Sequence, residues 1–433
     1  MRGLYGMVAA MVLSIVATYS FSACSKDDSD DSSEEILPYD ETYASSRTVM
    51  VYIVAENSLS GVVNSDVREM LAGIANPAFY PDDRIVLFVD DTQKPRIYEL
   101  DRNTTAQTLS DLTPVKEYPE DFNSASVDRL GEFFDYVKKR YAAESYGLVM
   151  WSHGWGWIPS TYAGDYSAKE RNVRNGQRRS FAVDNGFNTS EDIGHQMNID
   201  DIAHVLEQRG GVDFILFDAC FMQCIESAYE LRKATKYIIA SPAEIPGSGA
   251  NYSMMVSAMF QREDCAEQIF QTYYQTYANN LYWGIVISKV STDGLEAYAA
   301  VMRSLMAKYK TALLEADYSN VLNYYRYGPR KAYTYEYWGT DLPDFYDMQG
   351  LLKNVMSAED FALWQQETAK VITCAHADFW YSGYPGGYRT YPIDAGQCCG
   401  VSMFVPLEKY ADHPYQFNMT YLDCDWAQAV WID

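Results

Sequence analysis

Two short apolar segments, each followed closely by a residue suited to chemistry, constrain the fold of this chain most strongly. They are residues 146–151, which precede His153, and residues 212–217, which precede Asp218 and Cys220. Each is too short for an ordinary helix, and short apolar runs bounded by polar or glycine residues are typical of buried strands. Reactive groups collect at the carboxyl ends of strands in open α/β sheets. The sequence therefore predicts His153 and Cys220 at one edge of a sheet.

A cysteine beside a histidine is the minimum equipment for nucleophilic acyl transfer, because the imidazole helps to form the thiolate and then protonates the leaving amine. After Cys220 the apolar residues recur with helical spacing, at Phe221, Cys224, Ile225, Ala228 and Leu231. We therefore expect Cys220 at or just before a helix N-terminus, where the helix dipole favours the thiolate. The alternatives are a buried structural thiol at Cys220 and a packed imidazole at His153.

The sequence around these segments alternates between strand and helix patterns. Strands are predicted at 48–54 and 84–89, and helices at 65–74, 126–141 and 199–208. Such alternation implies a mainly parallel sheet covered by helices, which is an α/β architecture.

Two acids, Asp90 and Asp91, follow the strand predicted at 84–89. Paired carboxylates are potential metal ligands, but a solvated turn is the preferred interpretation. Zinc is not expected, since the chain has no Cys-x-x-Cys pair and no clustered His and Cys spacing. It has no recognisable EF-hand loop either. The residues alone therefore predict no metal site.

An apolar strand followed by His-Gly, and a second one followed by Asp-Ala-Cys, resembles the clostripain family of cysteine peptidases, relatives of the caspases and gingipains. Residues 48–59, 241–249 and 400–406 resemble the opening strand and turn, a later loop and a late strand of that family. The resemblance covers most of the chain from about residue 46 onward. It implies a caspase-like α/β/α sandwich with a mainly parallel central sheet, a peptidase core at 47–310 and a C-terminal extension at 311–433.

The same resemblance implies roles for particular residues. His153 and Cys220 match the catalytic dyad of the family. The expected oxyanion donors are the backbone N–H groups of Gly154, named first, and of Cys220. Asp218, two positions before the nucleophile, matches an acid that lines the S1 pocket of relatives specific for basic residues. The resemblance therefore implies cleavage after Arg or Lys.

One departure from the family pattern concerns that pocket. The family places a second acid between two glycines, where this chain has Ser248. Glu244 is the candidate to supply the missing charge, and the alternative role for Asp218 is only to order its turn. The sequence requires no cofactor, although calcium dependence is known among relatives.

The N-terminus has the pattern of a lipoprotein signal peptide at 1–23. Arg2 and the apolar run at 7–22 lead into Phe21-Ser22-Ala23-Cys24, which resembles a bacterial lipobox and implies lipidation of Cys24. Ordinary signal-peptidase cleavage is the alternative. The acidic, serine-rich stretch at 24–46 is expected to be a flexible tether. Lys26-Asp27-Asp28 resembles the surface-export signal of Bacteroidetes lipoproteins, so we expect an outer-membrane lipoprotein, with outward-facing display favoured over the periplasmic face.

A basic cluster lies between the two motifs, within residues 161–180, in a chain whose formal net charge is −25. It is either a solvent-exposed loop or, by resemblance to relatives that are cut there, a self-cleavage segment. The overall acidity argues against nucleic acid as a partner, because phosphate binding needs clustered Lys and Arg. The expected partners are protein or peptide substrates, and the membrane through a lipid at Cys24.

Two further functions remain open at this point. A surface lipoprotein without catalytic activity could use the chain's 37 tyrosines and 9 tryptophans to bind peptide or glycan. Hydrolysis of an amide other than a peptide is the second, since fold does not dictate function.

Cysteine usage bears on the nucleophile. Setting Cys24 aside leaves seven cysteines, so an oxidising compartment would leave at least one free thiol, and Cys220 fits it. The other six are candidates for disulfides of unknown connectivity, first among Cys374, Cys398, Cys399 and Cys424.

Overall fold

A nine-stranded sheet forms the centre of the molecule, in the order β12-β10-β9-β8-β5-β1-β2-β3-β4. The computed structural model describes residues 45–158, 180–186, 195–325, 343–382, 389–411 and 416–432, and the expectations for 1–44 and for the basic segment up to residue 179 lie outside these ranges. The strands of this sheet are β1 (Ser45–Val54), β2 (Arg84–Asp90), β3 (Arg96–Leu100), β4 (Lys116–Glu117), β5 (Ala143–Trp151), β8 (Val212–Asp218), β9 (Thr235–Ala240), β10 (Val286–Ser291) and β12 (Ile372–His376).

The middle of the sheet is parallel, and both edges are antiparallel. β1 pairs in parallel with β2 and β5, and β8 pairs in parallel with β5 and β9. β3 and β10 add antiparallel neighbours outside β2 and β9. The predicted mainly parallel α/β sheet is therefore confirmed. Because β5 and β8 are adjacent, the two segments that the sequence singled out end side by side.

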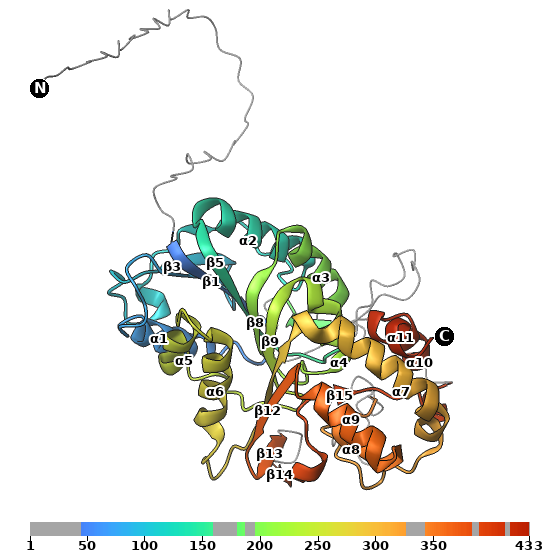
Figure 1. The fold of residues 1–433 in the computed structure, drawn as a ribbon. Coiled ribbons are helices and arrows are strands. Elements are labelled where there is room, and N and C mark those ends of the chain that lie inside the picture. The colour runs from blue at the N-terminus through green and yellow to red at the C-terminus, as the bar shows by residue number, and fades with distance from the viewer. Residues whose placement is uncertain are drawn as a thin grey trace, which may run out of the picture. The chain divides into compact units, whose positions relative to one another are not determined.

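Helices cover both faces of this sheet (Figure 1). Alternate residues of β1 belong to the two cores: Met50 and Tyr52 face the side of α2 and α3, whereas Val49 and Val51 face the side of α1, α5 and α6. This period of two is what buries a strand on both faces. The helices are α1 (Val63–Gly73), α2 (Val127–Arg140), α3 (Ile199–Gln208), α4 (Ile225–Glu230), α5 (Tyr252–Met259), α6 (Cys265–Tyr277), α7 (Leu295–Glu315), α8 (Met348–Val355), α9 (Ala358–Thr368), α10 (Phe417–Leu422) and α11 (Asp425–Val430).

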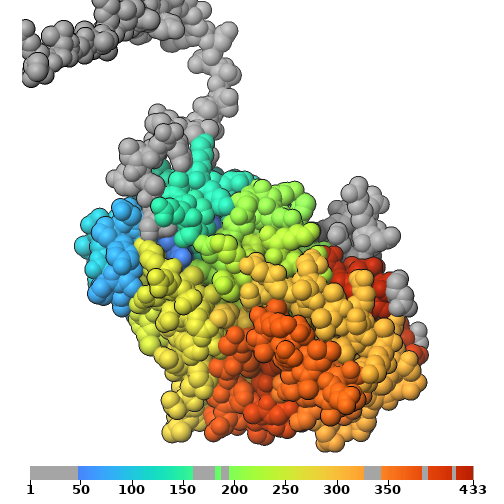
Figure 2. All heavy atoms as spheres, viewed as in Figure 1, coloured from blue at the N-terminus to red at the C-terminus, as the bar shows by residue number. Residues whose placement is uncertain are grey.

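The C-terminal third packs directly against the rest. β12 joins the large sheet next to β10, and the late strand expected near Val401 is the short β15 (Ser402–Met403), paired with β11 (Tyr346–Asp347). Figure 2 shows the orange surface of this third lying against the yellow and gold surface of α6 and α7. Two more small sheets pair β6 (Ser180–Asp184) with β7 (His195–Asn198), and β13 (Phe379–Ser382) with β14 (Arg389–Pro392).

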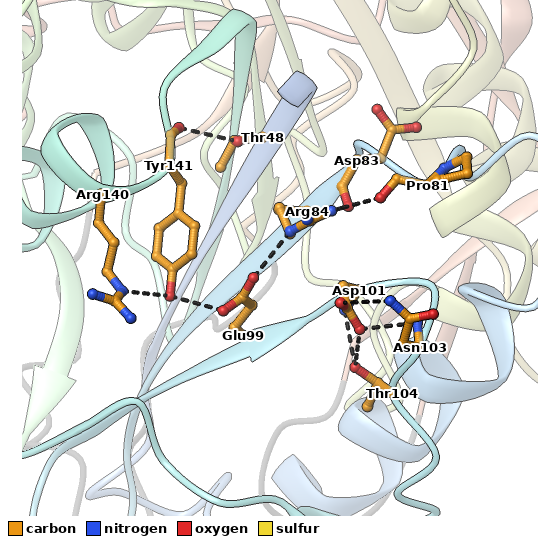
Figure 3. A network of polar contacts seen from close by, with 10 residues as sticks. All are labelled: Thr48, Pro81, Asp83, Arg84, Glu99, Asp101, Asn103, Thr104, Arg140 and Tyr141. Carbon is orange, nitrogen blue, oxygen red and sulfur yellow. Dashed lines mark hydrogen bonds and ion pairs between the residues drawn. The ribbon is translucent and has the colours of Figure 1, made fainter. Parts of the chain in front are cut away.

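A polar network closes the edge of the sheet where β1 and β2 begin (Figure 3). Glu99 accepts hydrogen bonds from Arg84 Nε at 3.0 Å and from the Tyr141 hydroxyl at 3.1 Å. Thr48 Oγ1 donates to the Tyr141 carbonyl at 3.3 Å. These contacts join β1, β2 and β3 to the end of α2. His153 and Cys220 lie at the opposite edge of the sheet, where the parallel strands end.

The cysteines do not form disulfides. All seven that follow Cys24 lie within the described residues, and each is a free thiol. The Sγ atoms of Cys374 and Cys398 are 3.9 Å apart, about twice the length of a disulfide bond. The disulfides expected from cysteine counting are therefore absent from this structure. Among the described helices, none combines the length and apolarity that crossing a membrane requires.

Candidate active site

His153 lies in the turn that follows β5, and its neighbours hold that turn in place. Ser152 Oγ donates to the carbonyl of Val54 at 2.8 Å, and Ala182 N donates to the carbonyl of His153 at 3.0 Å. Ser58 Oγ lies 3.0 Å from His153 Nε2, at hydrogen-bond distance. The half-buried imidazole is thus contacted from the loop between β1 and α1.

Cys220 lies in an irregular turn after β8. Phe221 has a left-handed backbone, with φ of 59°, and its N–H donates to the carbonyl of Ala243 at 3.0 Å. Cys224 is extended and caps α4, which begins only at Ile225. The expectation that Cys220 sits at a helix N-terminus is therefore wrong. Hydrogen bonding to the loop after β9 takes the place of the helical turn that the apolar spacing predicted.

The predicted stabilisation of the thiolate is wrong for the same reason. Burial raises the pKa of the Cys220 thiol to about 12, and the charge of Glu244 adds to this effect. Among the described residues, the N–H of Ile245 opposes this shift by donating to Cys220 Sγ at 3.4 Å. At neutral pH the Cys220 thiol is therefore mostly protonated.

The turns of His153 and Cys220 touch at Gly154. A Cβ atom added to Gly154 would lie 2.7 Å from the carbonyl oxygen of Cys220 and 2.6 Å from Met222 Sδ. The rings of Trp155 and Phe221 stack beside this contact with centroids 6.4 Å apart. Only glycine permits so close an approach, so the backbone of Gly154 lies directly against that of Cys220.

Asp218, the residue expected to line S1, is buried and fully hydrogen bonded. It accepts from the hydroxyls of Tyr252 and Tyr273, each at 2.8 Å, and from Ala250 N at 3.1 and 3.2 Å. Burial raises the pKa of this carboxyl, while the three donors oppose that shift. Gly249, with φ of 56°, passes so close that a Cβ there would lie 2.6 Å from Asp218 Oδ2.

The other two residues expected at S1 have different surroundings. Ser248 is exposed, and its Oγ lies 3.0 Å from the hydroxyl of Tyr277. That hydroxyl also donates to the carbonyl of Gly249, so Tyr277 of α6 holds the loop of Ser248 and Gly249 that packs on Asp218. Glu244 is half-buried, and its charge acts on the Cys220 thiol.

Asp66, in the first turn of α1, is an acid near Asp218 that sequence reasoning missed. It is 3% exposed and accepts a hydrogen bond from Trp151 Nε1 at 2.8 Å. Burial raises its pKa to about 8, and the charge of Asp218 is the next cause. An acid in a first helical turn is an ordinary capping residue, so the sequence carried no signal that this one faces the end of β5.

The interpretation of Asp90 and Asp91 as a solvated turn is also wrong. Asp91 is 8% exposed and pairs with Arg96 at 2.6 Å, and Asp90 is completely buried. Burial raises the pKa of Asp90 to about 9, with contributions from the neighbouring acids Asp184, Glu56 and Asp121. Every residue of β2 is buried, and Asp90, the last residue of the strand, is no exception.

Comparison with known proteins agrees with this architecture. The sequence profile of the clostripain family matches residues 51–430. A C11 protease from Parabacteroides distasonis, solved as an inactive zymogen, has 27% sequence identity and a TM-score of 0.70, over 89% of this chain and 98% of that one. A secreted C11 cysteine protease from Bacteroides thetaiotaomicron, solved with an irreversible peptide inhibitor, has 26% identity and a TM-score of 0.69 over the same shares.

The chain therefore belongs to the clostripain family of cysteine proteases and has its caspase-like fold. It is also 25% identical over 230 residues to clostripain of Hathewaya histolytica, an alignment that covers 47% of this chain and 40% of that protein. The chain thus matches less than half the length of this curated relative. The family resemblance and the fold expected from the sequence are confirmed.

Proposed function

We propose that the protein is an endopeptidase whose nucleophile is Cys220 and whose general base is His153. The observation that carries this proposal is the contact of their two turns at the carboxyl ends of adjacent strands, through the backbone of Gly154. A family of cysteine proteases supplies the reaction class.

In this proposal the chemistry proceeds by acyl transfer. His153 takes the thiol proton as Cys220 Sγ attacks the carbonyl carbon of the peptide bond, and a tetrahedral intermediate forms. The N–H groups of Gly154 and Cys220 are the proposed donors to its oxyanion. The imidazolium then protonates the leaving amine as the carbon–nitrogen bond breaks, which leaves the acyl group on Cys220 as a thioester. A water molecule, deprotonated by the same histidine, hydrolyses this thioester. Because the resting thiol is neutral, proton transfer accompanies the attack.

Basic P1 residues are the proposed specificity, and the buried acids near the Cys220 turn support it. Asp218 and Asp66 interact electrostatically strongly enough to shift a pKa. Each phenol that donates its proton to Asp218 keeps lone pairs that can accept from an ammonium or guanidinium group. Tyr252 and Tyr273, whose hydroxyls are polarised by their hydrogen bonds to Asp218, can therefore stabilise a positively charged P1 side chain.

The proposed site of action is outside the cytoplasm, on a lipid at Cys24. The lipobox-like sequence before Cys24 and the acidic stretch after it support this proposal. Labelling with a radioactive fatty acid tests it: the wild-type chain should take up label and the Cys24→Ser chain should not. Equal labelling of both would contradict the anchor and leave the peptidase proposal intact.

Fluorogenic peptides with Arg, Lys or a neutral residue at P1 test the peptidase proposal, in buffers with and without calcium. Wild type should cleave the basic peptides, Cys220→Ala should lose activity entirely, and Cys265→Ala, a half-buried cysteine on α6, should keep it. Cleavage of neutral P1 peptides alone would leave the dyad and contradict the basic specificity. Equal activity of Cys220→Ala and wild type would contradict the nucleophile.

A further inference from the structure

A second group of acidic side chains lies at the carboxyl edge of the sheet, away from Cys220. Glu56 follows β1, Asp90 ends β2, and Asp121 comes from the segment before α2. Carboxylate oxygens of these three residues all lie within 4.8 Å of one another. Glu56 and Asp90 are completely buried. Segments far apart in the sequence thus bring three carboxyl groups to one place.

Asp90 is the member of this group whose two carboxylate oxygens both lack a hydrogen-bond donor among the described residues. Both of its carboxylate oxygens are buried, and no hydrogen-bond donor among the described residues reaches either. The hydroxyl of Ser124 lies near enough to influence Asp90, but it donates to Asp184 Oδ2 at 3.2 Å, and Ser124 N donates to the same oxygen at 2.5 Å. Asp121 Oδ1 is likewise buried without a partner.

Buried carboxylates without donors need a counter-charge or a proton, because removing a charge from water is costly. One proton would neutralise one acid and leave the other two facing each other. A divalent cation compensates two of the three charges and offers both oxygens of Asp90 a partner. The described contacts pair Arg96 with Asp91 and not with Asp90, and Lys94 donates to the carbonyl of Pro119.

We infer that Glu56, Asp90 and Asp121 bind a hard divalent cation of the calcium class. All the donors are oxygen atoms, which suit Ca²⁺ and Mg²⁺ rather than softer metals. Oxygen ligands lie about 2.3–2.6 Å from Ca²⁺, so two ligands of one ion are at most about 5 Å apart. The corresponding limit for Mg²⁺ is about 4.2 Å. Donor atoms within 4.8 Å of one another therefore fit Ca²⁺ without movement of the chain. Mg²⁺ usually keeps several water ligands, so a site with two completely buried carboxylates favours Ca²⁺.

The cation site is connected to the loop that contacts His153. Glu56 is two residues before Ser58, whose hydroxyl is 3.0 Å from the imidazole. The backbone around Glu56 is fixed on two sides: Ala55 N donates to the Asp90 carbonyl at 2.7 Å, and Asn185 N donates to the Glu56 carbonyl at 3.0 Å. A cation shared by Glu56 and Asp90 would lock this loop. This positioning role rests on the proposed function, whereas cation binding does not.

Thermal unfolding of the full-length protein, freed of metal by EDTA, tests the cation site. Added CaCl₂ should raise the Tm of wild type by at least about 2 °C, because a ligand that binds only the folded state stabilises it. Asp90→Asn should lose this shift, and Asp91→Asn, whose native carboxylate pairs with Arg96, should retain it. Without calcium, Asp90→Asn should unfold at the same or a higher temperature than wild type, since it removes a buried carboxyl group whose oxygens have no donor among the described residues.

Terbium luminescence gives a readout that does not depend on unfolding or on activity. Wild type and Asp91→Asn should bind terbium and release it to calcium, and Asp90→Asn should bind at least tenfold more weakly. Equal responses of wild type and Asp90→Asn to both ions, or none from wild type, would overturn the site. An equal Tm shift with Mg²⁺ would overturn its assignment to calcium. If calcium binds but fails to raise kcat/KM, the role toward His153 is wrong and the site stands.

Discussion

Two buried aspartates end neighbouring parts of the same sheet, and their surroundings are opposite. Asp218, at the end of β8, accepts hydrogen bonds from two tyrosine hydroxyls and a backbone N–H. Asp90, at the end of β2, has two buried oxygens without donors among the described residues. Burial raises the pKa of both. The hydrogen-bond partners of a buried acid therefore indicate its role. Donors within the protein satisfy Asp218, whereas the lack of described donors at Asp90 supports the proposed cation there.

The largest expected effect on activity comes from removing the charge of Asp218, the aspartate whose oxygens are hydrogen bonded. Asp218→Asn keeps one acceptor oxygen for the tyrosines but loses the negative charge proposed to select P1. We expect kcat/KM for Arg and Lys peptides to fall about 100-fold, which corresponds to about 2.7 kcal/mol of transition-state binding. Neutral peptides should be affected much less. An equal loss for basic and neutral peptides would show that Asp218 only orders its turn.

Removing the donors should make Asp218 resemble Asp90. Tyr252→Phe and Tyr273→Phe each delete one hydroxyl and leave a buried carboxylate oxygen with fewer partners. Each should lower the free energy of unfolding by about 1–3 kcal/mol, the usual cost of an unsatisfied buried group, measured by urea denaturation. Tyr282→Phe, at a tyrosine that is 76% exposed, is the control. A loss below about 0.5 kcal/mol in both buried variants would mean that water replaces the hydroxyls.

Asp66 sharpens the comparison through pH. Its folded pKa is raised to about 8, so its contribution to stability is complete below pH 4 and is lost as pH rises toward 8. Asp66→Asn lacks this loss and keeps an oxygen for Trp151. Its stability relative to wild type should therefore increase between pH 4 and pH 8, by up to about 5 kcal/mol, and then level off. Asp128→Asn, an exposed acid in the first turn of α2, should show no such trend.

The smallest expected effect concerns the thiol. Glu244 is the second cause, after burial, of the raised pKa of Cys220. Glu244→Gln should lower that pKa and speed alkylation of Cys220 by iodoacetamide several-fold at pH 8, because the thiolate is the reactive form. Glu132→Gln, an exposed acid on α2, should leave the rate unchanged. An unchanged rate in Glu244→Gln would mean that burial alone governs the thiol.

The sequence predicted what depends on local periodicity. The apolar runs at 146–151 and 212–217 became the adjacent strands β5 and β8, and α3 has the predicted bounds of 199–208. The turn after Cys220 was mispredicted because its hydrogen bonds go to Ala243 and Ser241, which no local pattern reveals.

The environment of the acids could not be predicted for the same reason. Whether Asp218 meets tyrosines depends on how α5 and α6 pack, and whether Asp90 lies inside depends on segments ending at Glu56 and Asp121. The charge of an acid and its spacing along the chain do not reveal whether it is solvated or buried. Only the tertiary neighbours distinguish them.

The high pKa of Cys220 has a consequence for the lifetime of the protein. Peroxides and disulfides react with thiolates and scarcely with thiols, so a cysteine that holds its proton resists oxidation. A pKa of about 12 leaves only a minute fraction of Cys220 ionised at neutral pH. In the proposed mechanism, Cys220 is thus protected from oxidation while no substrate is bound, and it reacts only when His153 accepts its proton.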